Sequence, residues 1–210
     1  MNFLKTSNLG YPRIGENREW KKALEQYWAG KISEQTLKQL TEKVLLSNIQ
    51  KQVKQGIDFI PVNDFTYYDH MLDTATMFGI VPNRYGAIND TIPLNQYFSM
   101  ARGNSTAVAS EMTKWFNTNY HYIIPELNDI TFRLIENKPL KAYQKVKDTL
   151  GVEGKPVIVG PYTFLKLSKG YNEKQVPGIL LQLIPLYQQI LKELQHEGVQ
   201  WVQIDEPILV

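Results

Sequence analysis

The sequence predicts an α/β fold made of repeated β/α units with parallel strands. Short apolar runs alternate with longer segments of helical periodicity, and this order is typical of parallel β/α units. The apolar runs carry few polar residues, which indicates strands that are buried on both faces. At 210 residues, with 43% hydrophobic and 21% charged residues, the chain can bury a sizeable core.

Five apolar runs are predicted to be strands. They cover residues 3–9, 57–62, 120–124, 156–160 and 199–204, and residues 130–135 are a further candidate. Asn17 can cap a first helix, and Ser33 can cap a second one that Gly56 ends in a left-handed conformation. A third helix is predicted from about residue 177 to residue 197, where Pro185 indicates a kink or a break.

Four of the predicted strands lead into loops that combine polar and aromatic residues. These loops cover residues 10–15, 63–70, 160–163 and 205–207. Such residues at the C-terminal ends of strands are typical of a (β/α)8 barrel, whose site is built from these loops. A doubly wound sheet also binds ligands there, but no G-x-G-x-x-G motif follows any strand, so the barrel is preferred.

The predicted barrel is incomplete. Five or six strands are fewer than the eight that a closed barrel needs, and the chain stops at Val210, directly after a strand. Residues 1–210 are therefore expected to form about five or six of the eight β/α units of a TIM-type barrel. An open barrel exposes strand edges and half a core, which favours self-association of the truncated barrel.

Composition excludes several classes of function. A net charge of +2, without a long run of basic residues, argues against nucleic-acid binding. No apolar run reaches the ~18 residues of a membrane span, and the N-terminus lacks the layout of a secretory signal. The absence of cysteine excludes disulfides, thiolate catalysis and cysteine-ligated metal sites in this chain, and indicates a cytoplasmic protein.

The first predicted β/α loop and its helix carry four cations, Arg13, Arg18, Lys21 and Lys22. Taken alone, they fit a solvated helix face. At the N-terminus of a helix that follows a barrel strand, however, they would join the positive end of the helix dipole beside the site. Basic side chains in that position suit a ligand with several carboxylates.

Residues 111–122 mix aromatic side chains with Lys114, Asn117 and Asn119, and neither the helical nor the strand period sorts them. Two interpretations are equally supported. The segment either lines a pocket for a planar, polar, anionic molecule or forms an internally satisfied aromatic cluster.

Carboxylates follow two of the strands. Asp64 and Asp69 follow the second, and Asp205 and Glu206 the fifth. They could perform acid–base work, bind a ligand amino group, or act as helix caps, and capping is the plainest interpretation of Asp64 and Asp69. The three histidines lack the i,i+4 spacing of metal ligands, so no metal site is predicted in this chain.

Five motifs in order resemble the cobalamin-independent methionine synthase family. They are Leu9-Gly-Tyr-Pro-Arg-Ile-Gly15 with residues 18–22, Pro61-Val-Asn-Asp-Phe65 with residues 68–70, residues 111–122, Gly160-Pro-Tyr-Thr163, and Trp201-Val-Gln-Ile-Asp-Glu-Pro207. The likeness runs in register from residue 9 to the last residue. Family members are longer, so the resemblance implies that this chain is part of the N-terminal barrel of a two-barrel enzyme.

The resemblance implies transfer of a methyl group from 5-methyltetrahydropteroyl-polyglutamate to L-homocysteine. It places the zinc, held by His, Cys, Glu and Cys ligands, in a C-terminal catalytic barrel that is absent here, so this chain alone is expected to be inactive. It also associates Arg18, Glu19, Trp20, Lys21 and Lys114 with the folate polyglutamate tail. Arg and Lys can hold tail carboxylates, whereas Glu19 and Trp20 are expected to contribute backbone contacts or packing.

Two other functions remain as alternatives. The first is a glycoside hydrolase barrel that uses carboxylates such as Asp64 and Glu206 together with the Trp115 and Tyr120 aromatics. The second is a non-catalytic interaction module. Neither accounts for five motifs in order.

Overall fold

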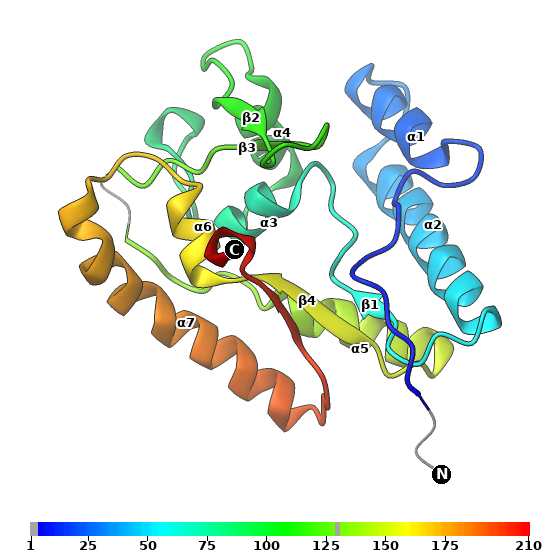
Figure 1. The fold of residues 1–210 in the computed structure, drawn as a ribbon. Coiled ribbons are helices and arrows are strands. Elements are labelled where there is room, and N and C mark those ends of the chain that lie inside the picture. The colour runs from blue at the N-terminus through cyan, green and yellow to red at the C-terminus, as the bar shows by residue number, and fades with distance from the viewer. Residues whose placement is uncertain (1–3, 129–130) are drawn as a thin grey trace.

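The computed structural model describes residues 4–128 and 131–210. Helices and short strands alternate along most of the chain (Figure 1). The helices are α1 (Glu19–Trp28), α2 (Glu34–Lys54), α3 (His70–Met77), α4 (Leu94–Arg102), α5 (Lys138–Leu150), α6 (Pro161–Lys166) and α7 (Val176–His196). The strands are β1 (Pro61–Val62), β2 (Met112–Lys114), β3 (His121–Ile123), β4 (Lys155–Val159) and β5 (Gln203–Asp205).

Three strands form a parallel sheet in the order β1-β4-β5. Pro61 pairs with Lys155, and Val157 pairs with Gln203. A single parallel bridge between Ser7 and Phe59 places the N-terminal segment next to the chain that leads into β1. The predicted α/β class with parallel β/α units is therefore confirmed, and the strands lie in the sheet in their order along the chain.

Some strand predictions were wrong. Residues 120–124 do not join the parallel sheet, because β3 pairs with β2 in an antiparallel hairpin in which Met112 lies opposite Ile123. Within 4–9 only Ser7 forms a bridge, and residues 131–135 form no strand, while residue 130 lies outside the described residues. The described part of the chain thus contains three paired parallel strands, fewer than the five or six expected, and two isolated parallel bridges, Ser7 with Phe59 and Glu126 with Lys169.

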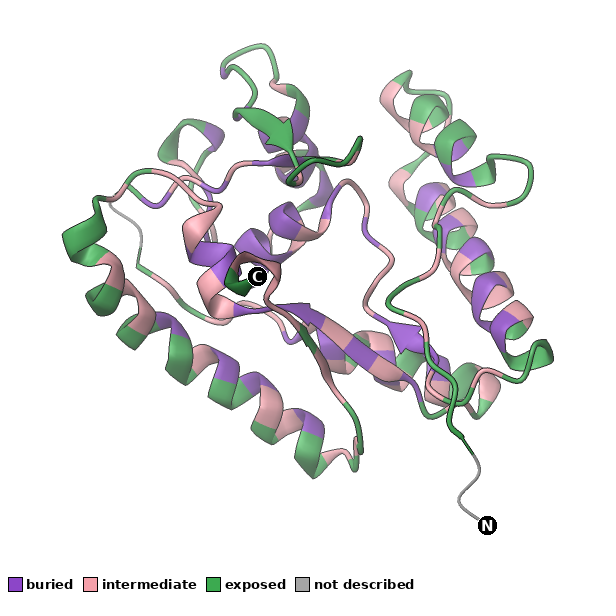
Figure 2. Ribbon diagram, viewed as in Figure 1, coloured by how far each residue is buried: buried purple, intermediate pink, exposed green. Residues whose placement is uncertain are grey.

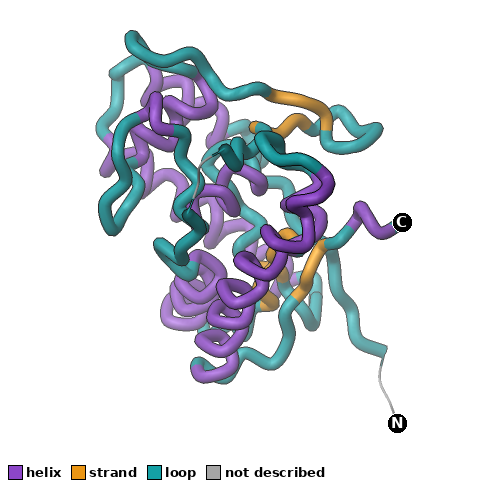
Figure 3. Tube along the Cα trace, turned by 90° about the vertical axis from the view of Figure 1, so that its left-hand side faces the viewer, coloured by secondary structure: helices purple, strands orange, loops and turns teal. Residues whose placement is uncertain are grey.

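Helices α2, α5 and α7 form a layer along the sheet. Neighbouring members of this layer contact each other, and α5 also packs on β1 and β4. Figure 2 shows buried stripes on the faces that these helices turn inward. Figure 3 shows the helices gathered on one side of the molecule and the C-terminal residues on the other. Buried apolar side chains such as Phe164, Leu183 and Ile190 fill the core beside α6 and α7.

The predicted caps are confirmed for α2 but not for α1. Ser33 accepts a hydrogen bond from the backbone N–H of Thr36, and Gly56 after the helix has a φ of 72°. Helix α1 begins one residue later than expected, since Arg18 is its N-cap. The Asn17 side chain donates instead to Glu19, at 3.2 Å.

Pro185 does not break α7, which is one continuous helix of 21 residues. The proline lies on the exposed face of the helix. Water can therefore hydrate the carbonyl group that loses its backbone donor to the proline ring.

Candidate functional site

A cleft of about 480 Å³ lies between the first loop, α1 and the end of the β2–β3 hairpin. Its walls include Arg13, Trp20, Lys21, Trp28 and Tyr120. The Arg13 guanidinium lies 5.9 Å from the centre of the Tyr120 ring, so a cation–π contact joins the first loop to the hairpin. The cleft thus combines aromatic walls with two cations, Arg13 and Lys21, and two carboxylates, Glu25 and Asp64. The aromatic walls suit the planar parts of a ligand, and the two cations can contact its anionic groups.

Helix α1 starts with a strained backbone. Arg18 has a φ of 62°, in the left-handed region that non-glycine residues rarely adopt, and its side chain is exposed. The Glu19 carboxylate accepts a hydrogen bond from the backbone N–H of Asn17 at 3.0 Å, and its own N–H group is the main reason that its pKa lies below the usual range. Glu19 therefore stabilises the turn that presents Arg18.

Trp20 and Lys21 point in different directions from the same turn of α1. Trp20 is only 2% exposed and packs with its ring centre 5.2 Å from that of Phe65. Lys21 is exposed, and its ammonium group lies 3.6 Å from the Glu25 carboxylate one helical turn later. Trp20 thus anchors the helix, while Lys21 remains accessible from the cleft.

Lys114 lies on β2, exposed and opposite His121 in the hairpin. The same hairpin contributes Tyr120 to the cleft, but Lys114 is not among the residues that line it. The structure therefore brings Trp20, Lys21 and the hairpin end together around one cleft. It leaves Lys114 outside the cleft, on the strand that leads into the hairpin end.

An aromatic cluster joins the hairpin to His70, the first residue of α3. Its imidazole stacks on Tyr120 with ring centres 5.1 Å apart and meets the edge of Trp115 at 4.3 Å. Burial, aided by the nearby Arg13 charge, lowers the pKa of His70 to about 4. Within residues 111–122, Trp115, Tyr120 and Tyr122 pack inward, whereas Lys114, Phe116 and the asparagines are exposed. The packing fits the aromatic-cluster interpretation, and the pocket interpretation stays a prediction.

The strand-end carboxylates have distinct structural roles. Asp69 caps α3 by accepting from the N–H of Leu72, and it also accepts from the N–H of Ile123 in β3. Asp64 is not a helix cap, because it accepts from the backbone N–H of Tyr11 at 2.7 Å and so holds the first loop. Capping was thus correctly predicted for Asp69 and wrongly for Asp64.

Glu206 joins two of the family motifs. Its carboxylate oxygens accept from the backbone N–H groups of Tyr162 and Thr163 at 3.0 and 2.6 Å, at the start of α6. A Cβ on Gly160 would lie 2.2 Å from the Glu206 carboxyl carbon, so the glycine is required by this contact. Because both oxygens of Glu206 are engaged, it is poorly suited to the acid–base role of a glycoside hydrolase.

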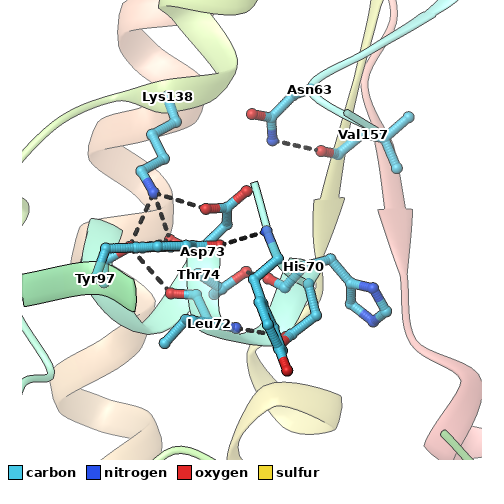
Figure 4. Close-up of polar contacts among 11 residues, drawn as sticks. Asn63, His70, Leu72, Asp73, Thr74, Tyr97, Lys138 and Val157 are labelled. Carbon is cyan, nitrogen blue, oxygen red and sulfur yellow. Dashed lines mark hydrogen bonds and ion pairs between the residues drawn. The ribbon is translucent and has the colours of Figure 1, made fainter. Parts of the chain in front are cut away.

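A second, smaller cavity of about 200 Å³ lies at the C-terminal ends of β1, β4 and β5. Asp64, His70, Trp115, Lys138 and Asp205 contribute to its walls. Figure 4 shows the Lys138 side chain reaching Asp73 and the Asn63 amide pointing to the Val157 carbonyl. This cavity was not predicted from the sequence, because Lys138 comes from a helix far along the chain. The sequence signal for it was limited to Asn63 and Asp64, which follow β1.

Residues 4–128 and 131–210 contain no group of three or more His, Cys, Asp or Glu side chains arranged to hold a metal ion. Within the same ranges, no helix combines the length and apolarity needed to cross a bilayer. The sequence has no cysteine, so its residues do not fit a zinc site with Cys ligands.

The chain is thus an α/β domain with a cleft and a polar cavity at the C-terminal ends of its parallel strands, where α/β proteins place their ligand sites. The sequence model of the family described as "Cobalamin-independent synthase, N-terminal domain" matches residues 5–210. The chain belongs to this family.

Curated relatives agree with the family match. A Bacillus velezensis protein is named 5-methyltetrahydropteroyltriglutamate–homocysteine methyltransferase. It is 56% identical to this chain over an alignment that covers 100% of the chain. Proteins of the same name from Bacillus subtilis and Bacillus cytotoxicus are 56% and 57% identical over 100% and 99% of the chain. The chain spans only 27% of the length of each relative.

Proposed function

We propose that this chain is the N-terminal part of a methyltransferase that moves a methyl group from 5-methyltetrahydropteroyl-polyglutamate to L-homocysteine, producing methionine. The names of relatives that match the whole chain at 56% identity support this activity. The contribution of these residues is to bind the polyglutamate tail of the folate. The observation that carries this role is Lys21 on the wall of a cleft beside Arg13 and Tyr120.

The basic residues supply the binding energy for the tail. Arg18 can hold a carboxylate with two parallel hydrogen bonds, and Lys21 and Lys114 act as point charges. All three side chains are exposed, so each reaches a flexible ligand without first breaking a buried contact. Glu19 and Trp20 act indirectly, since Glu19 supports the turn and Trp20 anchors α1 in the core.

Methyl transfer itself belongs to another part of the protein. Homocysteine activation by zinc needs thiolate or imidazole ligands, and this chain offers no cysteine and no matching cluster among its described residues. In this proposal the zinc and the homocysteine site lie in the portion of the relatives that this chain does not span, and the chain alone is inactive. The cysteine-free sequence is compatible with a cytoplasmic location.

The three parallel strands belong, in this proposal, to an incomplete (β/α)8 barrel. Their order in the sheet follows the chain, and α2, α5 and α7 pack side by side in the same order, as successive units of a barrel do. The remaining units would come from residues beyond the matched region. The open edge supports the expectation that the 210-residue chain self-associates.

The tail-binding role is tested with triglutamyl and monoglutamyl folate and the intact polypeptide that carries these residues. Lys21→Ala and Lys114→Ala should each weaken triglutamate binding by about 0.5–1 kcal/mol at low salt, as expected for partly exposed charge pairs. Monoglutamate binding should change less, because fewer carboxylates are in reach. Titration calorimetry measures both affinities.

Lys192→Ala is the matched control, because Lys192 is an exposed lysine on α7, which does not contribute to the cleft. Its triglutamate affinity should equal that of the unmodified protein. Equal triglutamate affinities for all three variants and the unmodified protein would refute the assigned role.

A further inference from the structure

Three carboxylates line the small cavity at the strand ends. Asp73 of α3 pairs with Lys138, and the other two come from different strands. Asp64 follows β1 by two residues, and Asp205 is the last residue of β5. Asp64 also lines the cleft proposed for the folate tail, so the two spaces adjoin but have different walls. The cavity holds three carboxylates and one lysine, whereas the cleft holds two of each charge, so the cavity is the more acidic space.

Both carboxylates lack a cationic partner. Neither forms an ion pair with a basic side chain of the residues that the structure describes. Asp64 accepts from the Tyr11 N–H, and Asp205 accepts from the Gln203 side chain at 2.9 Å. Burial raises the pKa of Asp64 to about 6 and raises the pKa of Asp205 above its usual range.

The two nearby lysines are already occupied. Lys155 donates to Ser7, to the Asn8 carbonyl and to Gln203 at 2.8, 3.1 and 2.6 Å. Lys138 donates to Asp73 and to Thr76 at 3.1 and 2.8 Å (Figure 4). Against the larger effect of burial, the charge of Lys155 lowers the pKa of both Asp64 and Asp205. With Asp73 paired to Lys138, these two aspartates still outnumber the one lysine that offsets them, so the cavity favours a cation over an anion.

Two more polar groups of the cavity have no partner. Thr66 is 3% exposed, and its hydroxyl oxygen forms no hydrogen bond with the described residues. The Nε2 atom of His70 is likewise buried and unpaired. Both residues line the cavity. Buried polar atoms without a partner are rare in folded proteins, and two of them beside one cavity indicate a missing polar ligand.

We propose that this cavity binds a small organic ammonium ion. The carboxylates of Asp64 and Asp205 and the Thr66 hydroxyl accept its N–H groups, and its short apolar body packs against Trp115 and Val159. A volume of about 200 Å³ corresponds to roughly seven water molecules at about 30 Å³ each, so the ligand has about five to seven non-hydrogen atoms. This inference does not depend on the proposed tail binding.

The test compares three probes of equal length on the intact polypeptide that carries these residues. They are n-butylammonium, uncharged 1-butanol and anionic butyrate, with affinities measured by saturation-transfer NMR at neutral pH. We expect n-butylammonium to bind at least 10-fold more tightly than either other probe. Equal or tighter binding of 1-butanol or butyrate would overturn the proposal, whatever the behaviour of any variant.

Three substitutions locate the binding. Asp64→Asn and Asp205→Asn should each weaken n-butylammonium binding about 10-fold, whereas Asp148→Asn, an exposed carboxylate on α5, should leave it unchanged. Thr66→Val keeps the side-chain shape and removes the unpaired hydroxyl. It should weaken n-butylammonium binding several-fold without lowering the unfolding temperature. Unchanged affinity in both Asp64→Asn and Thr66→Val would place the ammonium ion elsewhere and reject this site.

Discussion

Asp69 is the residue on which the position of the hairpin depends. Its side chain is fully buried and accepts one backbone N–H from α3 and one from β3, at 2.8 and 3.0 Å. Burial, aided by the Asp73 charge, raises the pKa of Asp69 to about 7, although the two N–H groups oppose this shift. One side chain thus joins the helix after β1 to the strand that follows the Tyr120 turn.

The raised pKa of Asp69 makes stability depend on pH. The folded state keeps this proton up to about pH 7, whereas the unfolded chain releases it near pH 4, so this contribution to stability is lost as pH rises through that window. Asp69→Asn should destabilise the protein by about 1–3 kcal/mol, because one buried N–H loses its acceptor. The difference in the free energy of unfolding between the unmodified protein and Asp69→Asn, measured by urea unfolding, should become smaller from pH 5 to pH 8.

Asp148→Asn serves as the control, since this exposed carboxylate should change stability little at either pH. A gap between the unmodified protein and Asp69→Asn that is constant or wider at pH 8 would show that Asp69 is already ionised at pH 5.

At the scale of elements, the start of α6 depends on a residue more than 40 positions later in the sequence. Gly160 is the N-cap of α6 but offers no side-chain acceptor, and Glu206 supplies the acceptors from the loop after β5. The contact couples the ends of β4 and β5. It also explains why Gly160 in one motif and Glu206 in another occur together in this sequence: the two residues meet in the fold.

A double-mutant cycle tests this coupling. Gly160→Ala should destabilise the protein because its Cβ would collide with Glu206, and Glu206→Ala should cost about 1–3 kcal/mol through two unsatisfied N–H groups. In the double variant the collision is absent, so the combined loss should be smaller than the sum of the single losses. Urea unfolding measures all four proteins, and strict additivity would contradict the proposed contact.

At the scale of the whole molecule, no strand among residues 4–128 and 131–210 pairs with the outer edge of β5 in the parallel sheet. β5 ends the strand order, and apolar side chains lie exposed on and before this strand, with Trp201 at 60% and Ile204 at 46%. Unpaired strand edges next to apolar surface are templates for association with another chain.

We expect the isolated 210-residue chain to self-associate through this edge. Its average mass in sedimentation velocity should rise with concentration, and Ile204→Lys should suppress the rise because a charge at the edge opposes pairing. Leu181→Lys is the matched control, since Leu181 is 72% exposed but lies on α7. A monomer at all concentrations, or equal suppression by both variants, would exclude the β5 edge as the contact.

The sequence alone determined the family, the α/β class and the elements whose signals are local. The caps of α2 depend on Ser33 and Gly56, which act within a turn of their own helix, and β4 is an apolar run that needs no partner to be recognised. The five motifs were likewise readable as linear patterns, and the family match over residues 5–210 confirmed the membership they implied.

Only the tertiary structure decided which distant groups meet. The apolar pattern of residues 120–124 suits a strand in the parallel sheet and a strand of a hairpin equally well. Pairing with β2 is seen only in the structure, because it depends on which backbone lies next to this segment. The partners of Asp64 and Glu206 lie 53 and 43–44 residues away. Such contacts depend on how the elements pack, because hydrogen bonds and burial act through distance in space rather than through spacing along the chain.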